Sequence, residues 1–345
     1  MTTLSTTAQE TIAETSTSIY NIIRSNPHKR LYCHPLEWTR DHQRLLIGKW
    51  IEQSPQQDED FEENDAHGAH RQSAATTTIT SQIADFPAYH IGILSNTPSC
   101  MEHPVVIRLM HHNSRLQHWR DWAMSKDANP PTLPLFFSNK EVTRLPVQCV
   151  FFSPEPNWAA KLAYLAEDDI TLSRRRYFIR PCARQDPKCR KPHRGRRKRP
   201  NEFVRRLQEI KLNKAMPSTC LEDPYITAVL IAMAQQQQRS CTTPPTGIIK
   251  VQLLLTCTGH QKHMYIFTGL IPMSFLNCFD SPCQAPLRSS TAIPARPSIL
   301  YSRVAFEPYG SFPTRLFSAI GQDVVRDGNN KPVAATGDSR TVEAF

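Results

Sequence analysis

The chain has 345 residues, with 41 Lys or Arg against 31 Asp or Glu and a formal net charge of +10. This length is enough for one large domain or two ordinary ones, with a core that needs no disulfides. Only 11 residues are glycine whereas 28 are proline, which disfavours glycine-rich phosphate-binding loops. Ten cysteines spread along the chain indicate reduced thiols and disfavour a secreted disulfide framework.

The N-terminal part alternates between polar and apolar segments. Residues 1–18 are rich in Thr and Ser and predict a disordered tail, without the basic and apolar regions of a signal peptide. Apolar and aromatic residues return over 19–52, where we expect a helical segment with an amphipathic helix over Glu37–Ile51. Acidic and small polar residues then predict a linker over 53–84.

Residues 85–180 are expected to form the N-terminal part of an α+β core. Runs rich in β-branched and aromatic residues predict short strands. These strands are expected at Tyr89–Leu94, Val105–Met110, Pro146–Phe152 and Tyr177–Ile179. Between the last two, Asn157 is a candidate N-cap for a helix over Trp158–Ala166.

A cationic segment interrupts the core. Between Arg174 and Arg199 the chain carries thirteen Lys or Arg and one acidic residue, and we expect residues 181–200 to form a basic exposed loop. Such clusters are typical of nuclear import signals and of patches that contact phosphates. The residues expected to do so are Arg174, Arg175, Arg176, Arg194, Arg196, Arg197, Lys198 and Arg199.

Residues 201–322 are expected to form the C-terminal part of the core, followed by a disordered tail over 323–345. Asn201 is a candidate N-cap for a helix whose apolar residues repeat at the spacing of a buried stripe; they are Phe203, Val204, Leu207 and Ile210. The pair Asp223-Pro224 predicts the start of a second, core helix. The remaining expected elements are an antiparallel hairpin of Gly247–Leu255 with His263–Ile271, a short helix after Pro272, a strand over Ile299–Phe306 and a helix over Phe312–Ile320. We therefore predict a mixed or antiparallel sheet with packed helices.

Three stretches of the C-terminal part carry a resemblance to known sequences. They are Glu222–Ile226, Met264–Pro272 and Phe275–Asp280, and through them residues 220 to about 320 resemble a group of uncharacterised proteins from filamentous fungi. The resemblance implies a fungal source and a compact α/β core. It supplies no activity and no catalytic residue.

One set of soft and imidazole ligands suits zinc. The set comprises Cys257, His260, His263, Cys278 and Cys283, which the predicted hairpin turn could bring together. The alternative is that the cysteines are buried free thiols that pack as small apolar side chains. We expect no cofactor, with zinc as the open alternative.

Sequence motifs for phosphate loops, dinucleotide binding, metalloproteases and serine hydrolases are absent from the sequence. A metal-dependent nuclease would need acids beside a lysine in the sheet, and Lys250 has no neighbouring Asp or Glu in its predicted strand. We therefore predict a non-enzymatic interaction or regulatory protein of the nucleus, or alternatively of the cytoplasm. Its expected partners are the import machinery and nucleic acid contacted without sequence specificity, and not a membrane. The alternative is a hydrolase or nuclease-like enzyme.

Overall fold

The structure of the protein, a computed structural model, has an α+β fold. It describes residues 19–26, 33–53, 91, 105–110, 120–121, 131–153, 159–179, 202–240, 247–258, 262–282 and 296–321. The predicted tails, the linker beyond Gln53 and the basic loop at 181–200 lie outside these residues.

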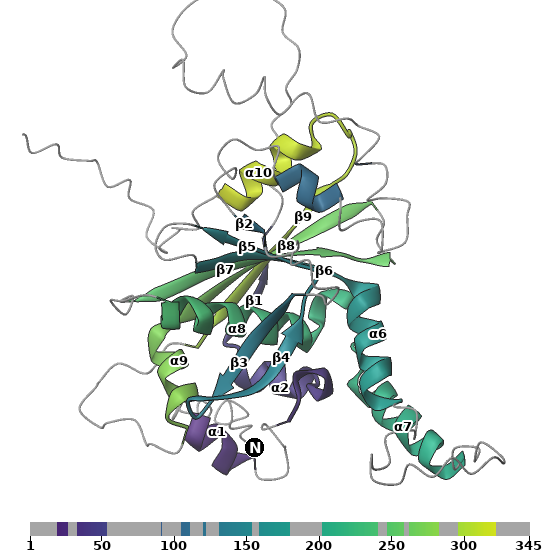
Figure 1. Ribbon diagram of the computed structural model, residues 1–345, viewed down its shortest axis with the longest axis vertical. Coiled ribbons are helices and arrows are strands. Elements are labelled where there is room, and N and C mark those ends of the chain that lie inside the picture. Colours follow the sequence, from purple (N-terminus) through teal and green to yellow (C-terminus); the bar gives the residue numbers. More distant parts are fainter. Residues whose placement is uncertain are drawn as a thin grey trace, which may run out of the picture.

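A seven-stranded mixed sheet runs through the middle of the molecule, in the order β1-β9-β8-β7-β6-β5-β2 (Figure 1). Its strands are β1 (Lys49–Glu52), β2 (Arg120–Asp121), β5 (Cys149–Ser153), β6 (Ala159–Ala166), β7 (Ile248–Thr256), β8 (His263–Pro272) and β9 (Ser298–Ala305). The pairs β1–β9 and β6–β7 are parallel, and the other neighbours are antiparallel. A second sheet is the antiparallel hairpin of β3 (Thr132–Phe137) and β4 (Lys140–Pro146).

Helices lie on both faces of the main sheet, and two helices extend away from it (Figure 1). The helices are α1 (Ile19–Ser25), η1 (Pro35–Glu37), α2 (Arg40–Leu46), α6 (Glu167–Phe178), α7 (Glu202–Ala215), η2 (Cys220–Glu222), α8 (Pro224–Ser240), α9 (Met273–Asp280) and α10 (Phe312–Gly321). The face that carries α8 also carries the β3–β4 hairpin, whereas the opposite face is covered by α10 and the helical residues 105–110. Helices α6 and α7 form the extended arm.

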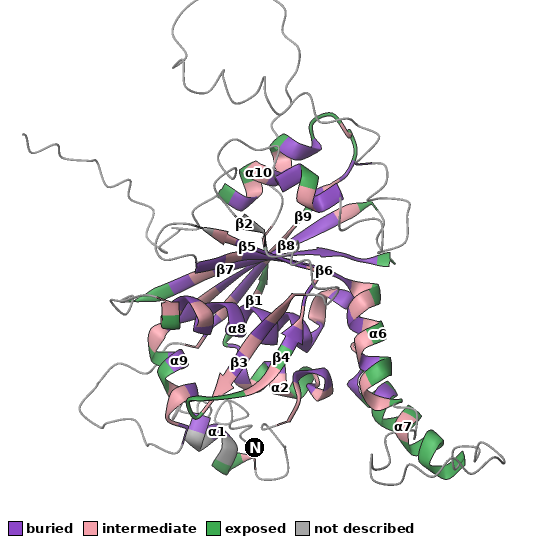
Figure 2. Ribbon diagram, viewed as in Figure 1, coloured by how far each residue is buried: buried purple, intermediate pink, exposed green. Residues whose placement is uncertain are grey.

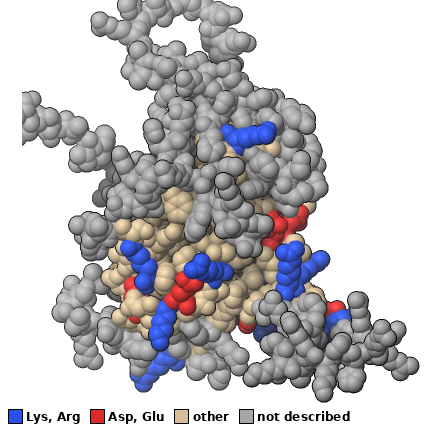
Figure 3. All heavy atoms as spheres, in the orientation of Figure 1, with Lys and Arg blue, Asp and Glu red and all other residues tan. Residues whose placement is uncertain are grey.

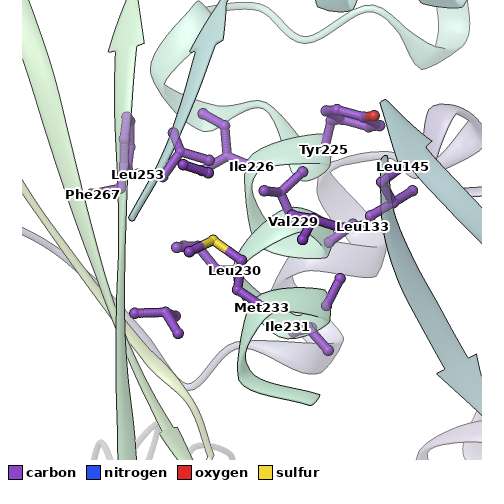
Figure 4. Packing of buried hydrophobic residues seen from close by; sticks show 14 of the residues in the cluster. Leu133, Leu145, Tyr225, Ile226, Val229, Leu230, Ile231, Met233, Leu253 and Phe267 are labelled. Atoms are coloured by element: carbon purple, nitrogen blue, oxygen red, sulfur yellow. The ribbon is translucent and has the colours of Figure 1, made fainter. Parts of the chain in front are cut away.

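The larger core is built around α8, which lies between the main sheet and the β3–β4 hairpin (Figure 4). Ile226 points toward Leu253 of β7, whereas Val229 points toward Leu133 and Leu145 of the hairpin. All five side chains are fully buried, and burial of each such side chain contributes about 1.5–3 kcal/mol. The nearly all-round apolar character of α8 therefore follows from its two apolar neighbours.

Close packing of α8 against β8 depends on Gly269. A Cβ at this position would lie 3.2 Å from Cγ2 of Val251 and 3.4 Å from Cβ of Leu230. The absence of a side chain lets the helix approach the strand here.

Several elements predicted from the sequence are confirmed. In the hairpin of β7 and β8, Ile248 pairs with Pro272 at one end and Thr256 pairs with Met264 at the other. Helix α8 begins at Pro224, directly after Asp223. Helices α9 and α10, strand β9 and the strand over Cys149–Ser153 also lie where the sequence predicts them.

Three predicted elements are wrong, and a fourth is confirmed only in part. Residues 159–166 form strand β6 instead of a helix, because this segment pairs with β5 and β7 and is buried on both faces. Tyr177 and Phe178 end helix α6 instead of starting a strand. Residues 105–110 are helical, with burial at positions spaced as on a helix.

The helix predicted over Glu37–Ile51 is present only over α2, which ends at Leu46, and β1 follows as an edge strand beside β9. Of Tyr89–Leu94 only Ile91 is described, and it is helical.

Candidate functional site

The cationic segment begins inside helix α6, and its first arginine is buried. Arg174 is 0% exposed and Asp223, at the start of α8, is 4% exposed. Nη1 of Arg174 donates to Oδ2 of Asp223 at 2.6 Å, and Nη2 donates to Oδ1. This placement corrects the expectation that Arg174 is available to phosphates, because its guanidinium faces an acid of the same chain.

The acid in this pair also organises the start of α8. Oδ1 of Asp223 accepts a hydrogen bond from the backbone N–H of Tyr225 at 2.8 Å, which is the geometry of an N-cap. The hydroxyl of Tyr225 donates to the carbonyl of Pro146 at 2.8 Å, and burial raises the pKa of this hydroxyl above its ordinary value. Asp223 therefore connects α6 to α8, and Tyr225 connects α8 to β4.

The next two arginines differ from the first. Arg175 and Arg176 lie in the last turn of α6 and are exposed. The other predicted import or phosphate-contacting residues lie outside the described part of the chain; they are Arg194, Arg196, Arg197, Lys198 and Arg199. On the face drawn in Figure 3, described positive and negative side chains are interspersed over the lower half of the molecule.

Helix α7 follows the cationic segment and is largely exposed (Figure 2). Its apolar stripe was predicted to be buried, and this prediction is wrong. Phe203 is 84% exposed, Leu207 54% and Ile210 57%, because α7 extends along the arm beside α6 and away from the sheet. Only Leu212 and Ala215, in its last turns, are buried among the residues of this helix.

Among the described members of the predicted zinc set, Cys257 and His263 lie at the same end of the β7–β8 hairpin, and Cys278 lies apart from them. Cys257 follows the end of β7, whereas Cys278 lies in α9, after the opposite end of the β7–β8 hairpin. The thiol of Cys278 donates to the carbonyl of Ser274 at 3.2 Å. His263 begins β8, and His260 and Cys283 lie outside the described residues. Strand β8 has ten residues, so its two ends are about 30 Å apart.

A different group of ligand atoms does converge at the end of β7. One ligand atom each from Glu167, Cys220 and Cys257 lie within 4.8 Å of one another. Cys257 is 4% exposed and Cys220 is 9% exposed. A hydrogen bond with the thiol of Cys220, followed by burial, raises the pKa of the Cys257 thiol above its ordinary value. Oε2 of Glu167 accepts from the backbone N–H of Thr258 at 3.1 Å.

Two hollows at the surface bear on the enzyme alternative. One, of about 140 Å³, lies between the N-terminal segment and the β3–β4 hairpin; its described lining is mainly apolar and includes no carboxylate. The other, of about 210 Å³, contains Asp41 and Glu222, and Glu222 pairs with Arg40 at 2.8 Å in an exposed position. The second hollow also contains Lys214, but none of its described lining residues belongs to a strand of the sheet.

Two residues of the thiol cluster were missed by the sequence analysis. Glu167 would have been noticed if β6 had been recognised as a strand, because it is the first residue after the carboxyl end of that strand. Cys220 carries no local signal that relates it to Cys257, which is 37 positions away in the sequence. Only the packing of η2 against the end of β7 brings the two thiols together.

Comparison with known protein families gave no match, and a search of curated proteins found no similar sequence. Among the described residues, no helix has the length and apolar character needed to cross a bilayer.

Proposed function

We propose that the protein is a non-enzymatic interaction protein of the nucleus. In this proposal, the cationic segment serves as an import signal and contacts the phosphates of nucleic acid without reading the base sequence. Membership of this protein in the group of filamentous-fungal proteins that its C-terminal part resembles is a separate prediction.

The observation that carries the proposal is the exposure of both described flanks of the cationic segment. Arg175 and Arg176, in the first part of the segment, are exposed in the last turn of α6, and α7 follows the segment with most of its side chains in solvent. The described residues that flank 180–201 therefore include exposed cations on both sides. This arrangement suits a region read by soluble import receptors or by the backbone of a nucleic acid.

Helix α7 adds cations to the same arm. Arg206, Lys211 and Lys214 are exposed, and Arg205 is exposed while pairing with Glu202 at 3.2 Å and with Glu209 at 3.6 Å. Phosphate contacts of this kind supply affinity and not specificity, since phosphates are the same at every base pair. The proposal therefore predicts binding that depends strongly on salt and weakly on sequence.

Import is tested by the distribution of the tagged full chain in cells. The variant replaces Arg196, Arg197, Lys198 and Arg199 with alanine. The control removes four exposed cations elsewhere, namely Arg44, Lys49, Lys140 and Arg303. Both variants lose the same charge, so only a local signal distinguishes them. We expect nuclear accumulation of the wild type and of the control but not of the variant. An unchanged distribution of the variant would remove the import role.

A further inference from the structure

The carboxyl ends of the parallel strands β6 and β7 meet at one edge of the main sheet. Ala166, the last residue of β6, is the register partner of Thr256, the last residue of β7. The next residues along the two strands are Glu167 and Cys257, so both leave the sheet at the same edge. Ligands of open α/β sheets commonly bind outside the carboxyl ends of strands.

The third member of the cluster reaches this edge through the crossover between the two strands. Helix α8 leads back to the start of β7, and its own start therefore lies near the carboxyl end of that strand. Cys220 lies in η2, just before α8. The Arg174–Asp223 ion pair fixes this arrangement, because Arg174 belongs to α6, which begins at Glu167, and Asp223 follows Cys220 by three residues.

We propose that Glu167, Cys220 and Cys257 bind a zinc ion. The side chains come from three separate elements, and their ligand atoms lie within 4.8 Å of one another. A tetrahedral zinc ion, with bonds of about 2.3 Å to sulfur and about 2.1 Å to oxygen, separates two sulfurs by about 3.8 Å and a sulfur from an oxygen by about 3.6 Å. No two of these atoms are therefore more than about 1.2 Å beyond the spacing that zinc imposes.

The chemistry of the donors favours zinc over the hard cations. Thiolates select zinc and similar metals, whereas magnesium and calcium prefer sites made wholly of oxygen ligands. Three protein ligands leave one position of the tetrahedron for water. The site retains Cys257 from the set predicted by sequence and replaces Cys278, which lies beyond the opposite end of the hairpin, with Cys220.

Binding must release protons, because zinc binds thiolates and not thiols. Because each thiol must release its proton on binding, the apparent affinity for zinc rises steeply with pH. A site built from carboxylates alone would show no such steep dependence near neutral pH.

The test uses the purified full chain, stripped of metal under reducing conditions and titrated with Co²⁺ and then Zn²⁺. Thiolate ligands give cobalt an intense sulfur-to-metal charge-transfer band, which added zinc removes. We expect one cobalt per chain in the wild type and in Cys278→Ser, whose thiol lies outside the cluster. Cys220→Ser and Cys257→Ser are each expected to lose at least about 10-fold in affinity, and Glu167→Gln to bind more weakly while keeping the band.

A second measurement needs no variant and therefore does not depend on the folding of one. Bound zinc should slow alkylation of Cys220 and Cys257 by iodoacetamide, mapped by mass spectrometry, while alkylation of Cys278 stays unchanged. The proposal is overturned if the wild type shows no charge-transfer band, if Cys278→Ser loses the band, or if zinc protects neither cluster thiol. Recovery of a Cys220–Cys257 disulfide as the stable form under the same reducing conditions would overturn it as well.

Discussion

Replacement of Arg174 with methionine is expected to lower the free energy of unfolding by about 3–5 kcal/mol, because it leaves a buried carboxylate without its partner. The estimate follows from the burial of both groups, with Arg174 0% and Asp223 4% exposed, and from the two hydrogen bonds that join them. The matched control is Arg175→Met in the same helix. Arg175 is exposed, so its replacement should change stability by less than about 0.5 kcal/mol.

The measurement is urea unfolding followed by circular dichroism, with stability compared through the midpoint at an unchanged slope. Asp223→Asn separates the two roles of the acid, since asparagine also caps helices but carries no charge. The double variant Arg174→Met with Asp223→Asn removes both charges, so its loss should be smaller than the sum of the single losses by about 0.5–3 kcal/mol. If Arg174→Met costs no more than Arg175→Met, the guanidinium is not buried and the account of α6 is wrong.

The remaining predictions concern the arm and the pH range of stability. In α7, Leu207→Ala should change the free energy of unfolding by less than about 0.5 kcal/mol, because Leu207 is 54% exposed. Leu212→Ala should lower it by about 2–5 kcal/mol, because Leu212 is 7% exposed. Equal losses of the two variants in urea unfolding would contradict the exposure of the apolar stripe. Burial raises the pKa of Tyr265 to about 12. Since the hydroxyl ionises near pH 10 in the unfolded chain, its contribution to stability is complete below about pH 10 and is lost as pH rises to about 12. Tyr265→Phe should flatten this fall in urea unfolding, and an unchanged slope would rule Tyr265 out as its source.

The C-terminal half of the fold was largely predictable because its local signals agree with its packing. Pro224 and Pro272 stand where helices begin, and the polar turn between β7 and β8 separates two clear strand runs. The β3–β4 hairpin was missed because its turn, Ser138-Asn139, is not one of the Asn-Gly or Asp-Gly pairs that mark two-residue hairpins in a sequence. In the structure both residues have positive φ, as such a turn requires.

Elements whose state depends on distant partners were not predictable in the same way. The alanines of β6 favour a helix by propensity, but pairing with β5 and β7 makes the segment a central strand. The apolar stripe of α7 has the period of a buried face, and nothing in that period reveals that the helix lies outside the core.

The same limit applies to the candidate sites. The sequence located the cationic segment, because charge is a local property. It could not show that Arg174 pairs with Asp223, 49 positions further along. It identified Cys257 as a candidate ligand but grouped it with Cys278, which lies beyond the opposite end of the hairpin. It did not include Cys220, because the approach of that thiol depends on the crossover through α8.

Binding of the full chain to a short duplex DNA across a salt series tests the proposed function most directly. The logarithm of the binding constant should fall linearly with the logarithm of the salt concentration, and each phosphate contact contributes about 0.9 to the slope. Alanine at Arg196, Arg197, Lys198 and Arg199 should therefore reduce the slope by up to about 3.6, whereas the control lacking Arg44, Lys49, Lys140 and Arg303 should keep the slope of the wild type. Absence of binding, or the same slope in the variant and the wild type, would contradict phosphate contact by the cationic segment.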